Sequence, residues 1–234
     1  DDIDAVYIFA GNRLGAELGR QAALAGKHIL LEKPMAADLA GAQGLLDAVE
    51  ASGVKILINW PNAWWPQLQQ ALQLAQDGEL GRVWSTRYRA AHCGPRELGC
   101  STHFCDWLYD AHENGAGALM DYCCYGAGIA SLLMGLPQSV IGEMGRLVKT
   151  DIDVDDNAMM ILRYADGMAS TEASWTQAGD MTSYQTTIYG ERKTVFVEPD
   201  RQDRIRIADN ENKMGVDVEV PEAPAHLKSA SANF

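Results

Sequence analysis

A lysine stands at the end of an apolar run, in the sequence Leu31-Glu32-Lys33-Pro34-Met35. If the run is a parallel strand, its carboxyl end faces the cleft in which sheets of this kind bind ligands, and Lys33 points towards that cleft. Pro34 biases Lys33 towards an extended backbone and makes the peptide bond between them a candidate for the cis form. Position therefore makes Lys33 a candidate for proton chemistry, with a solvated Glu32–Lys33 pair at a strand exit as the alternative.

A second candidate cluster follows the small-residue run from Gly115 to Ala118. Asp121 and Tyr125 are four residues apart, which places both side chains on one face of the helix expected there. A phenol beside a carboxylate can relay a proton, but tyrosine titrates at about pH 10 and needs an ammonium nearby to lower its pKa. The alternative is an Asp that complements the helix dipole and a Tyr that packs in the core.

Aromatic residues flank both clusters. Trp60, Trp64 and Trp65 follow the third apolar run, and Trp107 and Tyr109 precede the small-residue run. At the rim of a cleft, such rings can stack on a sugar ring or on an aromatic substrate. Packing between domains is the alternative, above all for Trp60 and Trp64.

Cysteine and histidine residues gather between positions 92 and 105. They are His92, Cys93, Cys100, His103 and Cys105. A tetrahedral zinc site needs four converging ligands, and cysteine spacings of 7 and 5 residues match no short Cys-x-x-Cys motif. We therefore expect no metal site and keep a metal-binding module as an alternative.

The segments that position these residues alternate between two hydrophobic periods in the first 80 residues. Buried strands are predicted at 4–10, 28–31 and 55–59, and helices at 14–26, 38–52 and 66–78. Strands separated by helices in this way form a parallel sheet, here half of a doubly wound one. Asp38 is placed to cap the start of a helix, and Gly26 and Gly53 are placed to end helices.

The pattern changes near residue 81 to longer strand-like runs joined by short turns. One helix is predicted at 117–134, and strands at 82–91, 139–148, 157–164, 167–175, 183–189, 193–197 and 204–208. Strands without intervening helices indicate a mostly antiparallel sheet. The predicted fold class is therefore α/β plus α+β, with a partial doubly wound parallel sheet in 1–80 and an antiparallel domain in 81–234.

Composition argues against several classes of partner. The 234 residues carry 32 Asp and Glu against 19 Lys and Arg, and a net charge of -13 repels nucleic acid and anionic lipid. No apolar run reaches the roughly 18 residues of a membrane-spanning helix, and no basic-then-apolar leader appears at the start. Five cysteines, an odd number, favour a reduced cytoplasmic setting, with Cys123 and Cys124 as core residues.

Five landmarks follow one another along most of the chain. They are Asn12 after the first strand, Glu32-Lys33-Pro34, Gly78-Glu79-Leu80-Gly81, Trp107-Leu108-Tyr109-Asp110 and Asp121-x-x-x-Tyr125. In order and spacing they resemble the Gfo/Idh/MocA family, which contains NAD(P)-dependent oxidoreductases of sugars, polyols and related cyclic compounds. The resemblance implies that 1–80 is the second half of a dinucleotide-binding Rossmann domain and that 81–234 is a substrate and oligomerisation domain.

The resemblance also implies roles for individual residues. Lys33 would assist proton transfer, Asp121 would orient the substrate or Lys33, and Tyr125 would be the acid/base. Tyr replaces the family's usual His here, as in the branch similar to glucose-fructose oxidoreductase and dimeric dihydrodiol dehydrogenase. The resemblance further implies that NAD or NADP binds to Asn12, Glu32, Lys33 and Pro34. It implies that a sugar-like or polyol-like substrate binds to Trp107 and Tyr109. A homodimer or tetramer is implied as well.

Departures from the family pattern qualify these roles. The Thr-Pro-x-x-x-His that usually follows the first strand is replaced by the residues at 10–15, and the Arg-Arg-Phe after the third strand by those at 62–64. No Gly-x-Gly-x-x-Gly precedes the first strand, so we expect a chain cut within its fold at the start, and near Phe234 as well. Such a chain would bind dinucleotide poorly alone. The main alternative function is a catalytically silent binding or scaffold protein.

Overall fold

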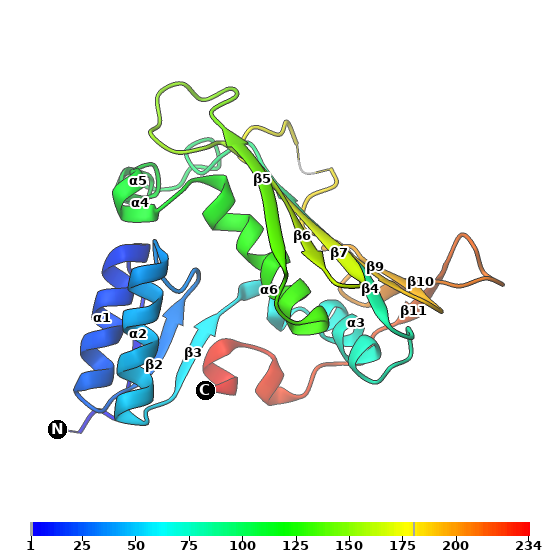
Figure 1. Cartoon of the computed structure of the whole chain (residues 1–234), viewed down its shortest axis with the longest axis horizontal. Coiled ribbons are helices and arrows are strands. Elements are labelled where there is room, and N and C mark those ends of the chain that lie inside the picture. Colours follow the sequence, from blue (N-terminus) through cyan, green and yellow to red (C-terminus); the bar gives the residue numbers. More distant parts are fainter. Residues whose placement is uncertain (1, 180) are drawn as a thin grey trace.

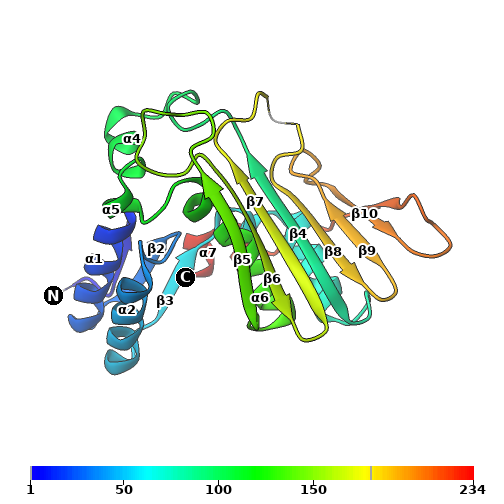
Figure 2. The same cartoon turned by 45° about the horizontal axis from the view of Figure 1, so that its top comes forward.

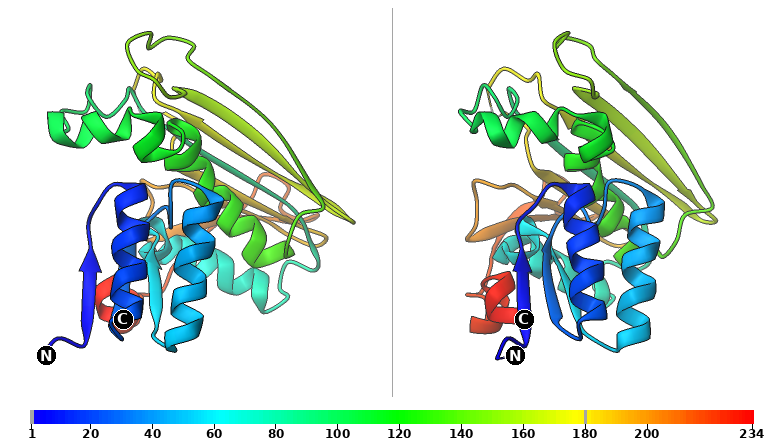
Figure 3. Two further views of the ribbon diagram at one scale, coloured as in Figure 1. Left: turned by 60° about the vertical axis from the view of Figure 1, so that its left-hand side comes forward. Right: turned by 90° about the vertical axis from the view of Figure 1, so that its left-hand side faces the viewer.

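The computed structural model describes residues 2–179 and 181–234, which form two sheets with helices against each (Figure 1). The smaller sheet has three parallel strands in the order β1-β2-β3, namely β1 (Ala5–Ile8), β2 (His28–Glu32) and β3 (Ile56–Asn59). The crossover helices α1 (Asn12–Leu24) and α2 (Leu39–Ser52) lie side by side on one face of it (Figure 3). The predicted parallel unit is confirmed.

The ends of α2 follow the expected local chemistry. The Asp38 carboxylate accepts a hydrogen bond from the backbone N–H of Gly41 at 2.8 Å, which satisfies an N-terminal donor of the helix. Gly53 ends the helix with a φ of 68°, a left-handed conformation that glycine adopts without a Cβ clash. The loop between β2 and α2 is thereby fixed, and this loop carries Lys33.

The larger sheet has eight strands in the order β11-β10-β9-β8-β4-β7-β6-β5 (Figure 2). Its strands are β4 (Val83–Ala91), β5 (Ser139–Gly145), β6 (Asn157–Tyr164), β7 (Gly167–Ser174), β8 (Gln185–Gly190), β9 (Thr194–Val197), β10 (Arg204–Ala208) and β11 (Val216–Glu219). Among the described strands of this sheet, only the central β4–β7 pair is parallel, which confirms a mostly antiparallel sheet.

The main core lies between this sheet and two helices, α3 (Pro66–Gln76) and α6 (Cys124–Met134) (Figures 1 and 2). Trp175, Leu80 and Ile188 are fully buried in it. The α3 residues Leu68, Ala71 and Ala75 belong to this core rather than to that of the parallel sheet. The predicted domain boundary near residue 80 stays a prediction.

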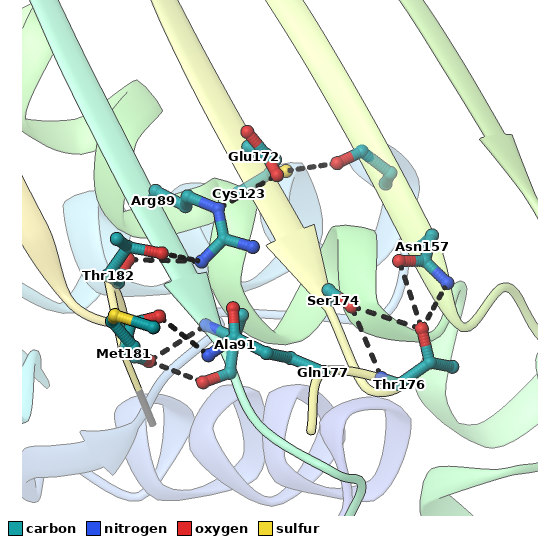
Figure 4. Close-up of polar contacts among 12 residues, drawn as sticks. Arg89, Ala91, Cys123, Asn157, Glu172, Ser174, Thr176, Gln177, Met181 and Thr182 are labelled. Carbon is teal, nitrogen blue, oxygen red and sulfur yellow. Dashed lines mark hydrogen bonds and ion pairs between the residues drawn. The ribbon is translucent and has the colours of Figure 1, made fainter. Parts of the chain in front are cut away.

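The opposite face of the large sheet points outward (Figure 2). At its strand ends, Arg89 on β4 pairs with Glu172 on β7 at 2.9 Å and donates to Thr182 (Figure 4). Nearby, the Asn157 side chain donates to the Thr176 hydroxyl at 2.9 Å. These polar contacts bind the central parallel pair to the turns beyond it.

Several elements differ from the sequence-based expectation. The helices α4 (Thr102–Leu108) and α5 (Ala111–Asn114) and the edge strand β11 were not predicted, because segments this short have little periodicity. The strand predicted to reach residue 148 ends at Gly145, because the Asp156 carboxylate accepts hydrogen bonds from the backbone N–H groups of residues 147–149. The predicted helix at 117–134 begins with a single π-helical turn, η2 (Leu119–Cys123), which precedes α6.

The last residues of the chain return to the parallel sheet. Two short helical turns, η3 (Ala225–Leu227) and α7 (Ala230–Asn233), lie beside the face of the parallel sheet opposite α1 and α2 (Figure 3). The Ser229 hydroxyl caps α7 by accepting a hydrogen bond from the backbone N–H of Ala232 at 3.1 Å.

One described helical stretch, Ala111–Met134, is long and apolar enough to cross a membrane by length and composition. It contains α6, which packs in the main core, and Asp121, which pairs with a lysine. A core helix of this composition explains the stretch without a membrane. One further short element, η1 (Pro61–Trp64), follows β3 and is flanked by Trp60 and Trp65.

Candidate active site

A cavity of about 740 Å³ lies where the carboxyl ends of the parallel strands meet α4 and η2. Ligands of such sheets bind at this place. The predicted site residues that line it are Asn12, Glu32, Lys33, Pro34, Trp107 and Asp121. Tyr109 and Tyr125, also predicted, are not among the described lining residues.

Lys33 and Asp121 form an ion pair across the cavity's inner wall. The Lys33 Nζ donates to the Asp121 Oδ1 at 2.5 Å and to the Asp121 carbonyl oxygen at 2.9 Å. The two side chains are 14% and 16% exposed, so solvent screens the pair only weakly. The peptide bond between Lys33 and Pro34 is cis, the form the sequence made a candidate. Residues 88 positions apart thus meet at one point.

Two phenol rings lie next to the ammonium. The Lys33 Nζ is 5.1 Å from the ring centroid of Tyr125 and 5.5 Å from that of Tyr122, both within cation–π range. The two rings are nearly parallel, at 23° and 6.4 Å. Asp121 and Tyr125 therefore both face Lys33, as their four-residue spacing predicted. Tyr125 is only 6% exposed, so its ring is a core group as well.

Electrostatics keep both proton-carrying groups protonated. Burial lowers the pKa of Lys33, but the Asp121 carboxylate and the neighbouring Tyr125 and Cys124 outweigh it and raise the pKa above its usual value. Burial raises the pKa of Tyr125, and the Lys33 ammonium only partly opposes that rise. The Lys33 ammonium therefore acts on the pKa of Tyr125 in the expected direction. Desolvation of the phenolate exceeds this attraction, so the pKa of Tyr125 stays above its usual value.

Trp175 holds the other oxygen of the carboxylate. Its indole Nε1 donates to the Asp121 Oδ2 at 3.1 Å, and the side chain is fully buried at the end of β7. Sequence reasoning missed this residue. The available signal was a tryptophan at the last position of the strand predicted at 167–175.

A buried polar chain supports Tyr122 from behind. The Gly94 N–H donates to the His92 Nδ1 at 2.8 Å, so a neutral His92 carries its proton on Nε2 and donates to the Tyr122 hydroxyl, also at 2.8 Å. The hydroxyls of Tyr122 and Tyr184 are 2.8 Å apart. His92 was considered from the sequence only as a metal ligand, and these contacts were not predicted, because a His that follows β4 gives no sign of which phenol it will meet.

Two glycines let the turn that carries Asp121 approach its neighbours. A Cβ at Gly115, whose φ is 89°, would overlap the carbonyl oxygen of Ala37 in the β2–α2 loop, and a Cβ at Gly117 would overlap that of Asp155. The Asp155 carboxylate accepts from the N–H groups of Gly117 at 2.6 Å and Leu119 at 2.8 Å. Burial raises the pKa of Asp155 although these N–H groups oppose the rise. The run of small residues thus presses η2 against the loop that carries Lys33.

Amides and carboxylates connect the strand ends to the helices above them. The buried Asn12 amide donates to the Asn114 Oδ1 at 2.5 Å and to its carbonyl oxygen at 3.1 Å. Glu32 accepts from the Tyr7 hydroxyl at 2.8 Å and from Asn59 at 2.7 Å. Burial and the Glu32 carboxylate raise the pKa of Tyr7 to about 12. Asn12 and Glu32 therefore have structural partners besides lining the cavity.

The predicted aromatic residues divide into two groups. Trp107 lines the cavity, whereas Trp60 packs edge-on against Tyr125 at 5.3 Å and Trp65 against Tyr184 at 6.0 Å. Trp64 donates from its indole nitrogen to Asn59.

Tyr109 is buried against Trp175, and its hydroxyl accepts from the backbone N–H of Arg96 at 3.2 Å. Contact between Tyr109 and a substrate stays a prediction.

The cysteines show no sign of a metal centre. In residues 2–179 and 181–234, no three His, Cys, Asp or Glu side chains are grouped so that they could hold a metal ion. All five cysteines are free thiols, and burial raises the pKa of Cys123 and of Cys124 to about 12. The metal-binding alternative at 92–105 therefore has no support in the described residues.

Comparison with known families shows which family the chain belongs to. The model of the GFO/IDH/MocA C-terminal domain matches residues 68–196, more than half of the chain, and that of the oxidoreductase family with an NAD-binding Rossmann fold matches residues 1–60. The chain belongs to the Gfo/Idh/MocA family. The expected fold, a small Rossmann-like parallel sheet followed by a larger mixed sheet, is that of the family.

Relatives within the Gfo/Idh/MocA family include two dehydrogenases of cyclic compounds. Levoglucosan dehydrogenase from Pseudarthrobacter phenanthrenivorans is 26% identical over 230 residues, which cover 88% of this chain and 58% of that protein. The scyllo-inositol 2-dehydrogenase (NADP(+)) of Bacillus subtilis is 28% identical over 223 residues, covering 88% of this chain and 61% of the relative.

Among solved structures, levoglucosan dehydrogenase in complex with NADH is similar with a TM-score of 0.83 and 25% identity. The match covers 96% of this chain and 62% of that one. The chain thus spans roughly three fifths of the length of the family members it matches.

Proposed function

We propose that the complete polypeptide is an NAD(P)-dependent oxidoreductase that transfers hydride between a nicotinamide and a carbinol carbon of a sugar, polyol or related cyclic alcohol. The observation that carries this proposal is the largely buried Lys33–Asp121 ion pair, at the carboxyl ends of parallel strands in a chain of the Gfo/Idh/MocA family. The names of its relatives, which are dehydrogenases of levoglucosan and scyllo-inositol, support this class of substrate.

The described residues fit the nicotinamide end of the cofactor. Asn12, Glu32, Lys33 and Pro34 line a cavity of about 740 Å³, and we propose that they contact the nicotinamide. When bound, this ring supplies the acceptor or donor of the hydride. The Gly-x-Gly-x-x-Gly sequence whose backbone binds a pyrophosphate does not occur in the 234 residues. The choice between NAD and NADP is therefore made by cofactor titration.

Lys33 and Tyr125 are proposed to manage the proton of the substrate hydroxyl. The Lys33 ammonium lines the cavity and can donate a hydrogen bond to the substrate oxygen, where it stabilises negative charge as hydrogen leaves the carbon. Tyr125 is the proposed acid/base. Because burial raises its pKa, the phenol is protonated at neutral pH and is suited to give a proton to a carbonyl that is being reduced. Asp121 orients Lys33.

The outward face of the large sheet is proposed to join two copies of the protein. It exposes Ile141, Met159, Ile161 and Met168, with Ile141 72% exposed. Apolar side chains on an uncovered sheet face favour association, in line with the homodimer or tetramer that the family resemblance implies. Ile141→Glu should lower the molar mass measured by light scattering without changing the circular dichroism. An unchanged mass would show that this face is not the interface.

The cytoplasmic location stays a prediction.

Cofactor titration tests the proposed function. The complete polypeptide should enhance the fluorescence of NADH or NADPH on titration, and the better cofactor should then support oxidation of levoglucosan, scyllo-inositol or D-xylose. The cofactor with the lower dissociation constant assigns the choice between NAD and NADP.

Two outcomes would decide against an enzyme. No fluorescence change with either cofactor at millimolar concentration would overturn the oxidoreductase. Binding without turnover of any cyclic alcohol would favour the catalytically silent binding protein. Lys27→Met serves as the matched control for substitutions at Lys33, because Lys27 is an exposed lysine of the same parallel unit that binds only a backbone carbonyl, that of Ile3.

A further inference from the structure

Gly11 lies between β1 and α1, and the backbone conformation at this position does not require a glycine. Its φ of -57° and ψ of 155° lie in the extended region that every L-residue adopts, and they suit proline as well. The contrast is with Gly26 and Gly53, whose φ values of 71° and 68° call for glycine although nothing lies within 4 Å of a built Cβ. A reason for glycine at position 11 must therefore be sought in the space around it.

That space belongs to Trp107. A Cβ at Gly11 would lie 3.2 Å from both Cδ2 and Cε3 of the indole, closer than ordinary van der Waals contact, and the ring would have to move by a few tenths of an ångström. The missing Cβ lets the indole rest directly on the backbone of the β1–α1 loop. Gly11 stands where the family pattern has the Pro of Thr-Pro. The residue that departs from the family pattern is therefore the one that Trp107 contacts.

Trp107 is held from a second direction by Phe104. The two rings meet edge to face at 5.2 Å and 82°, and both line the cavity, as does Phe9. Lys33 and Asp121 line the same cavity. The site therefore combines one charged pair with a set of aromatic rings, and Gly11 sets the position of the largest of them.

We propose that Gly11 is a specificity-determining residue, which seats Trp107 as a flat wall that stacks on the C–H face of a ring-shaped sugar or polyol. This rests on the proposed function for its substrate class. The negative face of an indole attracts the C–H groups that a pyranose or cyclitol presents on one side of its ring. An open-chain polyol has no such flat face, so the wall selects rings over chains of the same composition.

Fluorine NMR tests the seating of Trp107 without requiring turnover. The complete polypeptide is labelled with 5-fluorotryptophan, and Trp107→Phe identifies the resonance of Trp107 among those of all tryptophans. Gly11→Ala should shift the Trp107 resonance. Gly44→Ala is the matched control, because its Cβ would meet only the Arg20 Cδ at 4.0 Å, and it should leave that resonance in place.

Ligand titration on the same samples tests the selectivity. D-Glucose, a ring, should perturb the Trp107 resonance at lower concentration than D-glucitol, its open-chain counterpart. Gly11→Ala should reduce this preference by up to roughly tenfold, because a shift of a few tenths of an ångström should cost less than the roughly hundredfold loss that a 1 Å misplacement can cause. In the variants that lack Trp107, calorimetry gives the dissociation constants of the two sugars in place of the lost resonance. Gly11→Ala/Trp107→Phe should show the same ring preference as Trp107→Phe alone, since the two residues act through one contact.

Three results would overturn the proposal. They are an unshifted Trp107 resonance in Gly11→Ala, an equal or absent response of wild type to D-glucose and D-glucitol, and additive effects in the double variant. Failure of the proposed function is separately visible, because NADH titration of the unlabelled protein reports cofactor binding and does not depend on the Trp107 response.

Discussion

The two sheets contribute differently to the site. The parallel unit has strands of only four and five residues, and its edge strand β1 leaves Tyr7 exposed and is followed by an exposed Phe9. The eight-stranded sheet buries Trp175 completely and carries the main core. The small unit offers the ends of its strands, whereas the large unit offers a rigid support. The residues that line the cavity come from both units, with Lys33 from the parallel unit and Asp121 from the turn packed against the large sheet.

The contacts across the junction are few and directional. Lys33 reaches Asp121, Asn12 reaches Asn114, Arg13 donates to the carbonyl oxygen of His112, and Gly115 lies against the β2–α2 loop. Cores built from apolar contacts tolerate exchange of similar side chains, but single hydrogen bonds of this kind do not. Substitutions at the junction should therefore have larger effects than substitutions on either side of it.

The largest effect is expected for Lys33→Met. Loss of the ammonium should lower kcat by roughly 10²–10⁴-fold in the complete polypeptide, the range for removal of a proton-transfer group. The exposed Lys27→Met, in the same unit, should leave kcat within about twofold, as is usual for surface substitutions. Steady-state turnover of both variants with the preferred cofactor measures the difference. Equal kcat values in the two variants would show that the junction does not carry the chemistry.

The pH dependence of the reaction tests the role of Tyr125 on α6. Because burial raises the pKa of Tyr125 above its usual value of about 10, the phenolate that oxidation needs is scarce at neutral pH. The oxidation rate should therefore rise about tenfold per pH unit up to pH ~10, while reduction, which uses the protonated phenol, stays flat.

Tyr125→His replaces the phenol by a group that loses its proton at about pH 6.5, so oxidation should level off near neutrality. Between pH 7 and pH ~10 the wild-type oxidation rate should rise roughly a thousandfold, whereas the rate of Tyr125→His should change little over this range. Identical profiles for Tyr125→His and wild type would remove Tyr125 as the acid/base.

Gly115→Ala should separate the two sheets sterically. The new Cβ overlaps the carbonyl oxygen of Ala37, and the φ of 89° is unfavourable for alanine, so the free energy of unfolding should fall by about 3 kcal/mol. Gly128→Ala is the control. It lies on α6 with nothing within 4 Å of a built Cβ and should raise stability by up to about 1 kcal/mol. Urea unfolding gives both values, and equal values for the two variants would contradict the close approach.

Asn12→Ala should have the smallest effect of this series. It leaves the buried Asn114 Oδ1 without the amide that donates to it, at a cost of about 1–3 kcal/mol in the free energy of unfolding. Hydrogen exchange should rise first in α1 and α5, which this contact joins. Faster exchange spread evenly over the large sheet would mean that Asn12 supports more than the junction.

Much of the architecture was accessible from the sequence, because hydrophobic period alone separates parallel strands with crossover helices from strands joined by turns. The alternation before residue 80 gave β1 to α3 within a few residues. The failures have local causes. Helix α4 is seven residues long, and β5 stops early because Asp156 captures the backbone N–H groups that a longer strand would use.

For the site, the sequence indicated which residues could lie near the cleft but not their pKa values or hydrogen-bond partners. The strand-end position placed Lys33 at the cleft, and the resemblance to the Gfo/Idh/MocA family implied that Asp121 would orient the substrate or Lys33. The indole of Trp175 on Asp121 and the polar chain behind Tyr122 depend on tertiary packing that has no period. The pKa of Tyr125 followed desolvation rather than charge, and burial of one phenol cannot be read from a helix pattern.

The way Asp121 holds Lys33 bears on regiochemistry. An ammonium has three N–H donors, and the carboxylate and the carbonyl oxygen of Asp121 accept two of them. One donor is left for a ligand in the cavity, so Lys33 can select a single oxygen of a molecule that carries several equivalent hydroxyls. For a polyol, the carbon that reacts would then be decided by which hydroxyl reaches that one N–H.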